Sequence, residues 1–308
     1  MSDPVIVGVD GSARSLEAVV VAAREAHLRA VPLRIVHALG RRTAHPPSTT
    51  TTAPTGTTGT GTGTGTVQAS AGHGPAPPTP TTVADAEEQA HAAAPGVEVL
   101  RSVVPGEPRQ VLEHESRHAA LTVLASRGHS RVTDLLLGST AVHLAGHSHR
   151  PLIVVRGRPD PAGPVLLAVN GTPTEQAAVG FAFTEAALRK ASLRAVHVWN
   201  TWSERAYEGP GDPLNAMVTD IDHLRAIEEE LLEEAVAPLQ QAFPHVAVEH
   251  RLVRARTRPA LIDASREAQL VVVDPGPHGA VGGLLLGSVG QTLLHHAHCP
   301  VALVRGRQ

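Results

Sequence analysis

The chain carries one stretch of sequence twice, and this repeat restricts the possible fold more than any other feature. Residues 4–39 (PVIVGVDGSARSLEAVVVAAREAHLRAVPLRIVHAL) align without gaps with residues 164–199 (PVLLAVNGTPTEQAAVGFAFTEAALRKASLRAVHVW). Farther along, RPLIVVRGR at 150–158 matches CPVALVRGR at 299–307. The offset is 160 residues at the front (4 to 164) and 149 at the back (150 to 299), so the halves keep one order and differ by insertions. Such self-similarity indicates two related domains in tandem.

We place these domains at 1–158 and 159–308, since 308 residues allow about two domains of ordinary size. Strands and helices are expected to alternate along each half. In domain two, the expected strands lie at 164–170, 193–199, 246–253, 270–273 and 300–304. The expected helices lie at 174–191, 215–242, 258–267 and 288–297.

Apolar runs such as LVVV and LIVV are continuous, which is typical of strands that are covered on both faces. Five strands joined by helices then predict an open, parallel, Rossmann-like sheet in each α/β domain. Ligands bind such sheets in the crevice at the carboxyl ends of the strands, where the strand order reverses.

A segment rich in Thr, Gly and Pro interrupts the first domain at about residues 43–82. It contains almost no large apolar side chain, so burial offers little to offset the entropy of ordering it. We therefore expect a disordered insertion between the second strand and the second helix of domain one.

Composition argues against several classes of partner. The net charge of −3 gives no electrostatic reason to bind nucleic acid or a membrane. The single cysteine, Cys299, suits a reducing compartment, and the short apolar run near the N-terminus, interrupted by Asp10, does not read as a signal peptide. We expect a cytoplasmic protein.

Histidines gather at 295–299 (HHAHC), but this cluster does not predict a metal site. Neighbouring side chains at a helix end point in different directions, whereas a zinc site draws on converging ligands. Histidine near a helix C-terminus also has an ordinary electrostatic explanation. We therefore expect no metal-binding residues.

The best candidates for a ligand-binding site are the loops after the fourth strand of each domain. The segment ASRGHSRVTDLLLGST (125–140) places Gly128 ten residues before Gly138, and Ser139 opens a helix. Glycines let backbone N–H groups approach a phosphate, and a helix start adds free N–H donors. Asp10 ends the first strand at the same sheet edge. A Walker-type loop is excluded, because the only lysine, Lys190, lies within a helix.

With Asp10 and the spacing Ala125-x2-Gly128-x9-Gly138-Ser139, the chain resembles the universal stress protein family over nearly all of both halves. The resemblance implies an adenine nucleotide alpha hydrolase-like fold, ATP as ligand and Mg²⁺ accompanying the nucleotide. It also implies little or no enzymatic activity. The family pattern has glycine at position 125, and alanine is a mild change if its φ is negative. The site residues expected in domain one are Val9, Asp10, Ala38, Leu124, Ala125, Gly128, Gly138, Ser139 and Thr140.

Domain two departs further from the family pattern. It reads Asp274-x2-Pro277-x9-Gly287-Ser288, and an asparagine replaces the aspartate after the first strand. Proline lacks the N–H group that would donate to a phosphate, and Asp274 would repel one. A weaker second site would consist of Asn170, Val198, Gly287 and Ser288.

Three functions therefore stay open. The first is a stress-response protein that binds an adenine nucleotide in domain one and has a degenerate second site. The second is a module for dimerisation or protein interaction that acts without nucleotide, and the third is a slow ATP hydrolase. The resemblance also implies self-association through the terminal strands.

Overall fold

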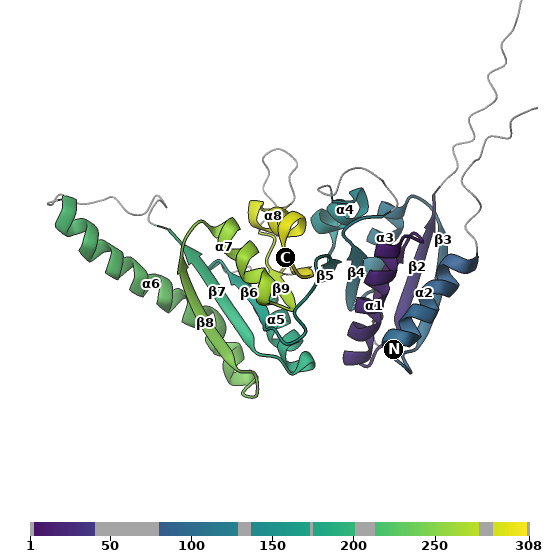
Figure 1. Ribbon diagram of the computed structural model, residues 1–308, viewed down its shortest axis with the longest axis horizontal. Coiled ribbons are helices and arrows are strands. Elements are labelled where there is room, and N and C mark those ends of the chain that lie inside the picture. The colour runs from purple at the N-terminus through teal and green to yellow at the C-terminus, as the bar shows by residue number, and fades with distance from the viewer. Residues whose placement is uncertain are drawn as a thin grey trace, which may run out of the picture.

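The computed structural model describes residues 3–40, 80–128, 137–172, 175–200, 213–276 and 286–306, with no side chains described at 80–81 and 213–220. Strands and helices alternate through both halves of the chain (Figure 1). The strands are β1 (Val5–Val9), β2 (Leu33–Leu39), β3 (Val99–Pro105), β4 (Leu121–Ala125), β5 (Leu152–Val155), β6 (Val165–Val169), β7 (Leu193–Trp199), β8 (Val248–Arg254), β9 (Leu270–Val273) and β10 (Val301–Leu303). The helices are α1 (Ala13–Leu28), α2 (Pro80–Ala93), α3 (Pro108–Ser116), α4 (Ser139–His147), α5 (Gln176–Arg189), α6 (Pro213–Ala242), α7 (Thr257–Ala264), the short 3-10 helix η2 (Ser265–Glu267) and α8 (Ser288–His296).

The strands of both domains form one ten-stranded sheet in the order β3-β2-β1-β4-β5-β10-β9-β6-β7-β8. Within each domain all neighbouring strands are parallel, as the sequence predicts, and the order reverses beside the first strand. The two halves meet where β5 and β10 pair antiparallel, with Ile153 opposite Ala302. An approximate two-fold axis between these strands therefore relates the domains.

This junction involves the two terminal strands, through which the family resemblance implies self-association. β5 and β10 are the last strands of the two domains, and they hydrogen-bond to each other within one chain. Each strand thus covers the edge that a second chain would need. The tandem arrangement thus pairs the terminal strands within one chain, and self-association with a second chain stays a prediction.

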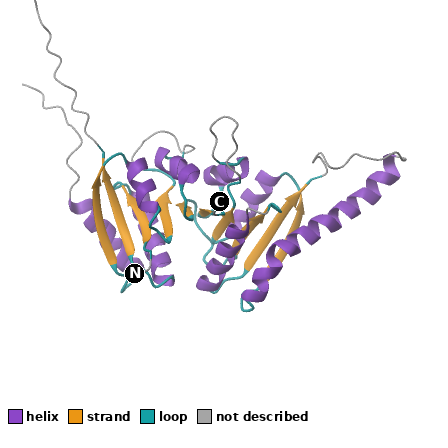
Figure 2. Ribbon diagram, turned by 180° about the vertical axis from the view of Figure 1, so that it is seen from behind, coloured by secondary structure: helices purple, strands orange, loops and turns teal. Residues whose placement is uncertain are grey.

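Helices cover both faces of the sheet (Figure 2). Side chains alternate along each strand, so Val5 and Val7 join the core beneath α1, α2, α5 and α6, whereas Ile6 joins the core beneath α3, α4, α7 and α8. α1 begins at a serine N-cap, because the Ser12 hydroxyl accepts a hydrogen bond from the Ser15 N–H group at 3.2 Å. The sheet edge at the carboxyl ends of the strands lies between these helical layers.

A buried group of four charges joins α1 to α5 across the domain boundary. Arg29 pairs with Glu25 and with Glu185, and Arg189 pairs with the same two glutamates, the Arg189 Nε–Glu185 Oε2 distance being 2.9 Å. Burial raises the pKa of Glu25, and the neighbouring Glu185 adds to the shift. Each residue lies 160 positions from its counterpart in the repeat (25 to 185, 29 to 189), so the repeat builds this contact symmetrically.

The expected elements of domain two are all present with end shifts of a few residues. α5 ends at Arg189 because Lys190 adopts a left-handed conformation with φ of 54°, which stops the helix before residue 191. In domain one, α2 begins at Pro80, inside the insertion predicted at 43–82, and proline favours the first turn of a helix. Of that insertion, residues 43–79 lie outside the described part of the chain.

Candidate functional site

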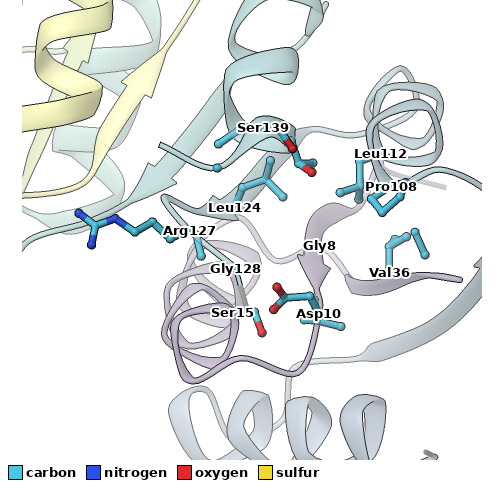
Figure 3. A pocket seen from close by; sticks show the side chains of 16 residues that line it. Gly8, Asp10, Ser15, Val36, Pro108, Leu112, Leu124, Arg127, Gly128 and Ser139 are labelled. Carbon is cyan, nitrogen blue, oxygen red and sulfur yellow. The ribbon is translucent and has the colours of Figure 1, made fainter. Parts of the chain in front are cut away.

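A cavity of about 270 Å³ opens at the carboxyl ends of β1 and β4 in domain one (Figure 3). It lies where the strand order reverses, as expected for an open α/β sheet. All the site residues predicted for this domain line it: Val9, Asp10, Ala38, Leu124, Ala125, Gly128, Gly138, Ser139 and Thr140. The structure therefore brings together residues from β1, β2, β4, α4 and the loop after β4.

Seven further residues of the described chain line the cavity beside the predicted set: Gly8, Ser15, Val36, Pro108, Leu112, Arg127 and Ala141. Gly8 and Val36 each lie two positions before a predicted residue, so strand periodicity was a signal for them. Pro108 and Leu112 come from α3, and no motif marks them. Figure 3 shows that Val36, Pro108 and Leu112 form one side of the cavity, away from Gly128.

Asp10 is held in a fixed orientation at the end of β1. Its Oδ1 atom accepts hydrogen bonds from the Ser12 N–H group at 3.0 Å and from the Ser12 hydroxyl at 2.6 Å. Gly11, with φ of 86°, makes the turn between them. The second oxygen, Oδ2, lies against Gly128, and Figure 3 shows the two residues side by side at the cavity. The carboxylate of Asp10 therefore lines the cavity beside the loop that follows β4.

Two glycines are needed because other groups approach them closely. A Cβ atom at Gly128 would lie 2.2 Å from Asp10 Oδ2, and one at Gly8 would lie 2.7 Å from Leu124 Cδ2. Either side chain would push into the cavity wall. Gly128 thus leaves room for the Asp10 carboxylate and exposes its own backbone to the cavity.

The N-terminus of α4 points donors into the cavity. Gly138 is the N-cap and has no side chain to bond the first turn, so the N–H groups of Ser139, Thr140 and Ala141 have no acceptor within the helix. The Gly138 N–H group itself donates to Ser126 O at 2.8 Å, which closes the loop after β4. Uncapped amides and the helix dipole together favour an anion at this position.

Alanine at position 125 preserves the backbone of the motif. Ala125 is the last residue of β4 and pairs with Val155 in the extended sheet. It is absent from the described residues with positive φ, so glycine is not required here. The departure from the family pattern at this position therefore changes the cavity surface by one methyl group.

The matching region of domain two contains two buried carboxyl groups in place of small residues. Glu175 stands where domain one has Ser15, and Asp274 where it has Ala125; they are 2% and 6% exposed. Glu175 accepts hydrogen bonds from the N–H groups of Asn170 at 2.7 Å and Gly171 at 3.0 Å. Burial raises the pKa of Glu175, and Asp274 raises it further.

The predicted second-site residues occupy equivalent places. Asn170 follows β6 and accepts the Thr172 N–H group at 2.8 Å, Val198 lies in β7, and Gly287 caps α8 before Ser288. Pro277 lies outside the described residues. The two buried carboxyl groups share this sheet edge, and they distinguish it from the edge of domain one.

Within the described part of the chain, no group of three or more His, Cys, Asp or Glu side chains is placed to hold a metal ion. Cys299 is buried beneath α8, and burial raises the pKa of its thiol to about 12. No helix in the described ranges is both long and apolar enough to cross a membrane.

These features define a tandem protein of two doubly wound α/β domains, with a ligand-sized cavity at one sheet edge. The sequence profile of the Universal stress protein family matches residues 1–156 and 162–305. Universal stress protein Rv2623 of Mycobacterium tuberculosis is 32% identical over 306 residues, which cover 98% of this chain and 96% of that protein. Universal stress protein Mb2019 of Mycobacterium bovis is 31% identical over 313 residues, covering 98% and 94%. The chain therefore belongs to the universal stress protein family.

Solved structures share the same two-domain fold. The crystal structure of a universal stress protein from Archaeoglobus fulgidus has a TM-score of 0.59 at 16% identity, covering 98% of this chain and 96% of that one. A functionally unknown protein, PA1789 from Pseudomonas aeruginosa, has a TM-score of 0.60 at 12% identity, covering 98% and 92%. At these identities the similarity concerns the fold.

Proposed function

We propose that this protein is a stress-response protein that binds one adenine nucleotide, ATP, in domain one, and that domain two is a structural partner without a working site. The boundary that we propose between them is 158/159. The observation that carries the proposal is the combination, in one cavity, of the uncapped α4 N-terminus with the fixed carboxylate of Asp10.

The two sides of the cavity suit the two ends of a nucleotide. Val36, Ala38 and Leu112 provide an apolar surface of the kind on which an adenine ring packs. Asp10 Oδ2 would accept a hydrogen bond from a ribose hydroxyl. The phosphates would lie at the first turn of α4, where Ser139 and Thr140 offer hydroxyl groups as well as amides.

The groups that line the cavity support binding rather than chemistry. Among the described residues, the lining holds one carboxylate, Asp10, and its Oδ1 atom is already bonded to Ser12. We therefore propose that any ATP hydrolysis is slow and that Mg²⁺ enters only with the phosphates of the nucleotide.

Domain two is proposed not to bind because Glu175 and Asp274 would add negative charge where phosphates would sit. Like charges at short range in a partly buried site cost far more than in water. Gly287 and Ser288 then serve the fold, as the N-terminus of α8.

Calorimetric titration of nucleotide-free protein with ATP tests the proposal, using Gly138→Val and Gly138→Ala as a graded pair. A Cβ at position 138 would meet Ser126 O at 3.5 Å and Arg127 Cα at 3.6 Å, which are ordinary contacts, and φ of −64° suits any residue. Alanine should therefore bind ATP like the wild type. Valine adds methyl groups over the amide of Gly128 and should weaken binding at least about tenfold.

The outcomes separate the three functions. Binding that Gly138→Val weakens supports the nucleotide proposal, and release of phosphate in the same samples would add slow hydrolysis. No heat and no thermal stabilisation at millimolar ATP would leave the interaction module as the function.

A further inference from the structure

A second, more open cleft lies at the junction of the two domains. Its volume is about 840 Å³, and guanidinium groups dominate its lining: Arg14, Arg127, Arg156, Arg158 and Arg266, with His298 beside them. These residues come from α1, the loop after β4, the end of β5, η2 and the segment before β10. Both domains therefore contribute to the cleft.

Positive charge exceeds negative charge in this cleft. Among the described residues, five guanidinium groups and one carboxylate, Glu17, line it. Glu17 pairs with Arg14 at 3.1 Å, and at the rim Asp263 lies 3.6 Å from Arg266 Nε. Burial lowers the pKa of His298, and the nearby Arg266 and Arg156 lower it further, as expected in a positive environment. The cleft is thus a site that favours an anion.

Arg156 is the most constrained of these cations. Its Nη1 atom donates to Leu293 O at 3.0 Å, whereas its buried Nε atom has no hydrogen-bond partner among the described residues. Burial lowers the pKa of Arg156 to about 10, and the charge of Arg127 contributes to the shift. The group still carries its charge at neutral pH, and a bound oxyanion would offset both the burial and the repulsion.

The backbone at this point is built for close approach between the domains. Gly157 has φ of 59°, and a Cβ atom there would lie 2.0 Å from His298 O. The next N–H group, that of Arg158, donates to the same oxygen at 2.8 Å. This contact places Arg156 and Arg158 of domain one beside His298 of domain two.

Arg127 connects the cleft to the cavity of domain one, because it lines both. In Figure 3 its side chain extends away from Asp10 and Ser139 toward the ribbon of domain two. The Arg127 guanidinium group therefore lies between the cleft and any phosphates bound at the N-terminus of α4.

The repeat shows that this connection is specific to domain one. Arg156 has a counterpart in Arg305, and Arg266 has one in Arg117, each 149 residues away (156 to 305, 117 to 266). Two other arginines of the cleft lack such counterparts. Arg14 corresponds to Thr174, and Arg127 corresponds to Gly276.

We propose that this cleft binds a chain of linked phosphates, held by fork-shaped guanidinium donors from both domains. Several guanidinium groups spread over one open cleft match successive tetrahedral oxyanions better than a single phosphate. The chain is either inorganic polyphosphate or the distal phosphates of a nucleotide that is longer than ATP. The nucleotide form rests on the proposed function of domain one, whereas the inorganic form does not.

Titration with inorganic tripolyphosphate tests the cleft without any adenine group. The variant is Arg158→Gln/Arg266→Gln, which leaves the cavity lining untouched. The matched control is Arg117→Gln/Arg307→Gln, which also removes two positive charges, at the positions 149 residues from Arg266 and Arg158 (117 to 266, 158 to 307); Arg117 pairs with Glu113 at 3.4 Å. We expect tripolyphosphate to bind the wild type and the control alike and the double variant at least about tenfold more weakly.

A second arm uses diadenosine tetraphosphate and ATP to identify the source of the phosphates. A double variant that weakens diadenosine tetraphosphate but not ATP indicates the extended nucleotide, and one that weakens only tripolyphosphate indicates the inorganic chain. If tripolyphosphate binds and ATP does not, the result supports the proposal for the cleft and contradicts the function proposed for domain one. No tripolyphosphate binding at low salt, equal loss in the control, or equally tight binding of poly-glutamate would overturn the proposal.

Discussion

The two domains share one fold and differ in what they place at the same sheet edge. Both have the same strand order, and in both a glycine precedes the helix that ends the motif, Gly138 in one and Gly287 in the other. Domain one opens a cavity there, lined by small residues such as Ala125. Domain two places Asp274 at the matching position, buried to 6% exposure. A motif that repeats in sequence thus keeps the start of a helix in both domains but places different side chains beside it, and on this difference rests our proposal that only domain one binds a nucleotide.

The shared features are those that the fold itself needs. Asp10 and Asn170 each accept the N–H group two residues later, so this turn is made with or without a charge. In both domains a histidine of the second strand bonds the last carbonyl group of the first strand: His37 with Val9 O at 2.8 Å, and its domain-two counterpart likewise at 2.9 Å. Neither feature by itself indicates a ligand.

The largest effect should come from moving the charge of domain two into domain one. Ala125→Asp would put a carboxylate beside the phosphates and should weaken ATP binding about a hundredfold, which is roughly 2.7 kcal/mol. Ala125→Asn has nearly the same shape without the charge and should retain most of the affinity. Equal losses in the two variants, measured by calorimetry, would show that size rather than charge separates the domains.

A smaller loss is expected from removing the side chain that makes the turn. Asp10→Ala should weaken ATP binding about tenfold or more, because a hydrogen bond to a charged group contributes about 1.5–3 kcal/mol. Asn170→Ala removes the matching turn bond in domain two and should lower the melting temperature without changing ATP affinity. Loss of affinity in Asn170→Ala would place a nucleotide in domain two.

A smaller change in ATP binding is expected from giving domain two the small residues that line the cavity of domain one. The triple variant Glu175→Ser/Asp274→Ala/Pro277→Gly restores the residues that domain one has at positions 15, 125 and 128. We expect a second ATP-binding event in calorimetry, weaker than the first because Asn170 replaces Asp10. A stoichiometry that stays at one would mean that other parts of domain two block the site.

The smallest expected effect is on folding stability, because the buried Glu175 side chain of domain two destabilises the fold when it is ionised. Because the pKa of Glu175 is raised from 4.5, the folded state holds its proton more tightly than the unfolded state. That contribution favours folding below pH 4.5 and is lost as the pH rises through the folded pKa. Glutamine keeps one acceptor oxygen and has no charge to bury, so the melting temperature of Glu175→Gln relative to the wild type should be higher at pH 8 than at pH 4.

The expected difference is a few degrees, since about 1 kcal/mol moves the melting temperature by roughly 2–4 °C in domains of about 150–250 residues. Thermal melts of both proteins at the two pH values measure it. A larger benefit of the substitution at pH 4 would contradict the assignment of a raised pKa.

Sequence patterns predicted the fold well because the repeat and the continuous apolar strands are local signals. They also predicted the glycines and hydroxyl residues of the motif that line the cavity, Gly128, Gly138, Ser139 and Thr140, together with Asp10. They missed Pro108 and Leu112, because α3 reaches the cavity only through tertiary packing. They likewise missed Glu175, whose role depends on hydrogen bonds to backbone N–H groups that no spacing reveals.

The pairing of β5 with β10 could not be predicted from the sequence either. A terminal strand with a bare edge can pair with another chain or with the sister domain, and its residues are the same in either case. The interdomain group of Arg29, Glu185 and their repeat partners favours the pairing within the chain.

The most direct test of the central claim is the stoichiometry of ATP binding to the nucleotide-free wild-type chain, measured by calorimetry. The difference between the domains predicts one ATP per chain, and Ala125→Asp should weaken that binding about a hundredfold. Two equivalent events would show that Glu175 and Asp274 do not exclude phosphates, and a single event unaffected by Ala125→Asp would place the nucleotide outside the cavity of domain one.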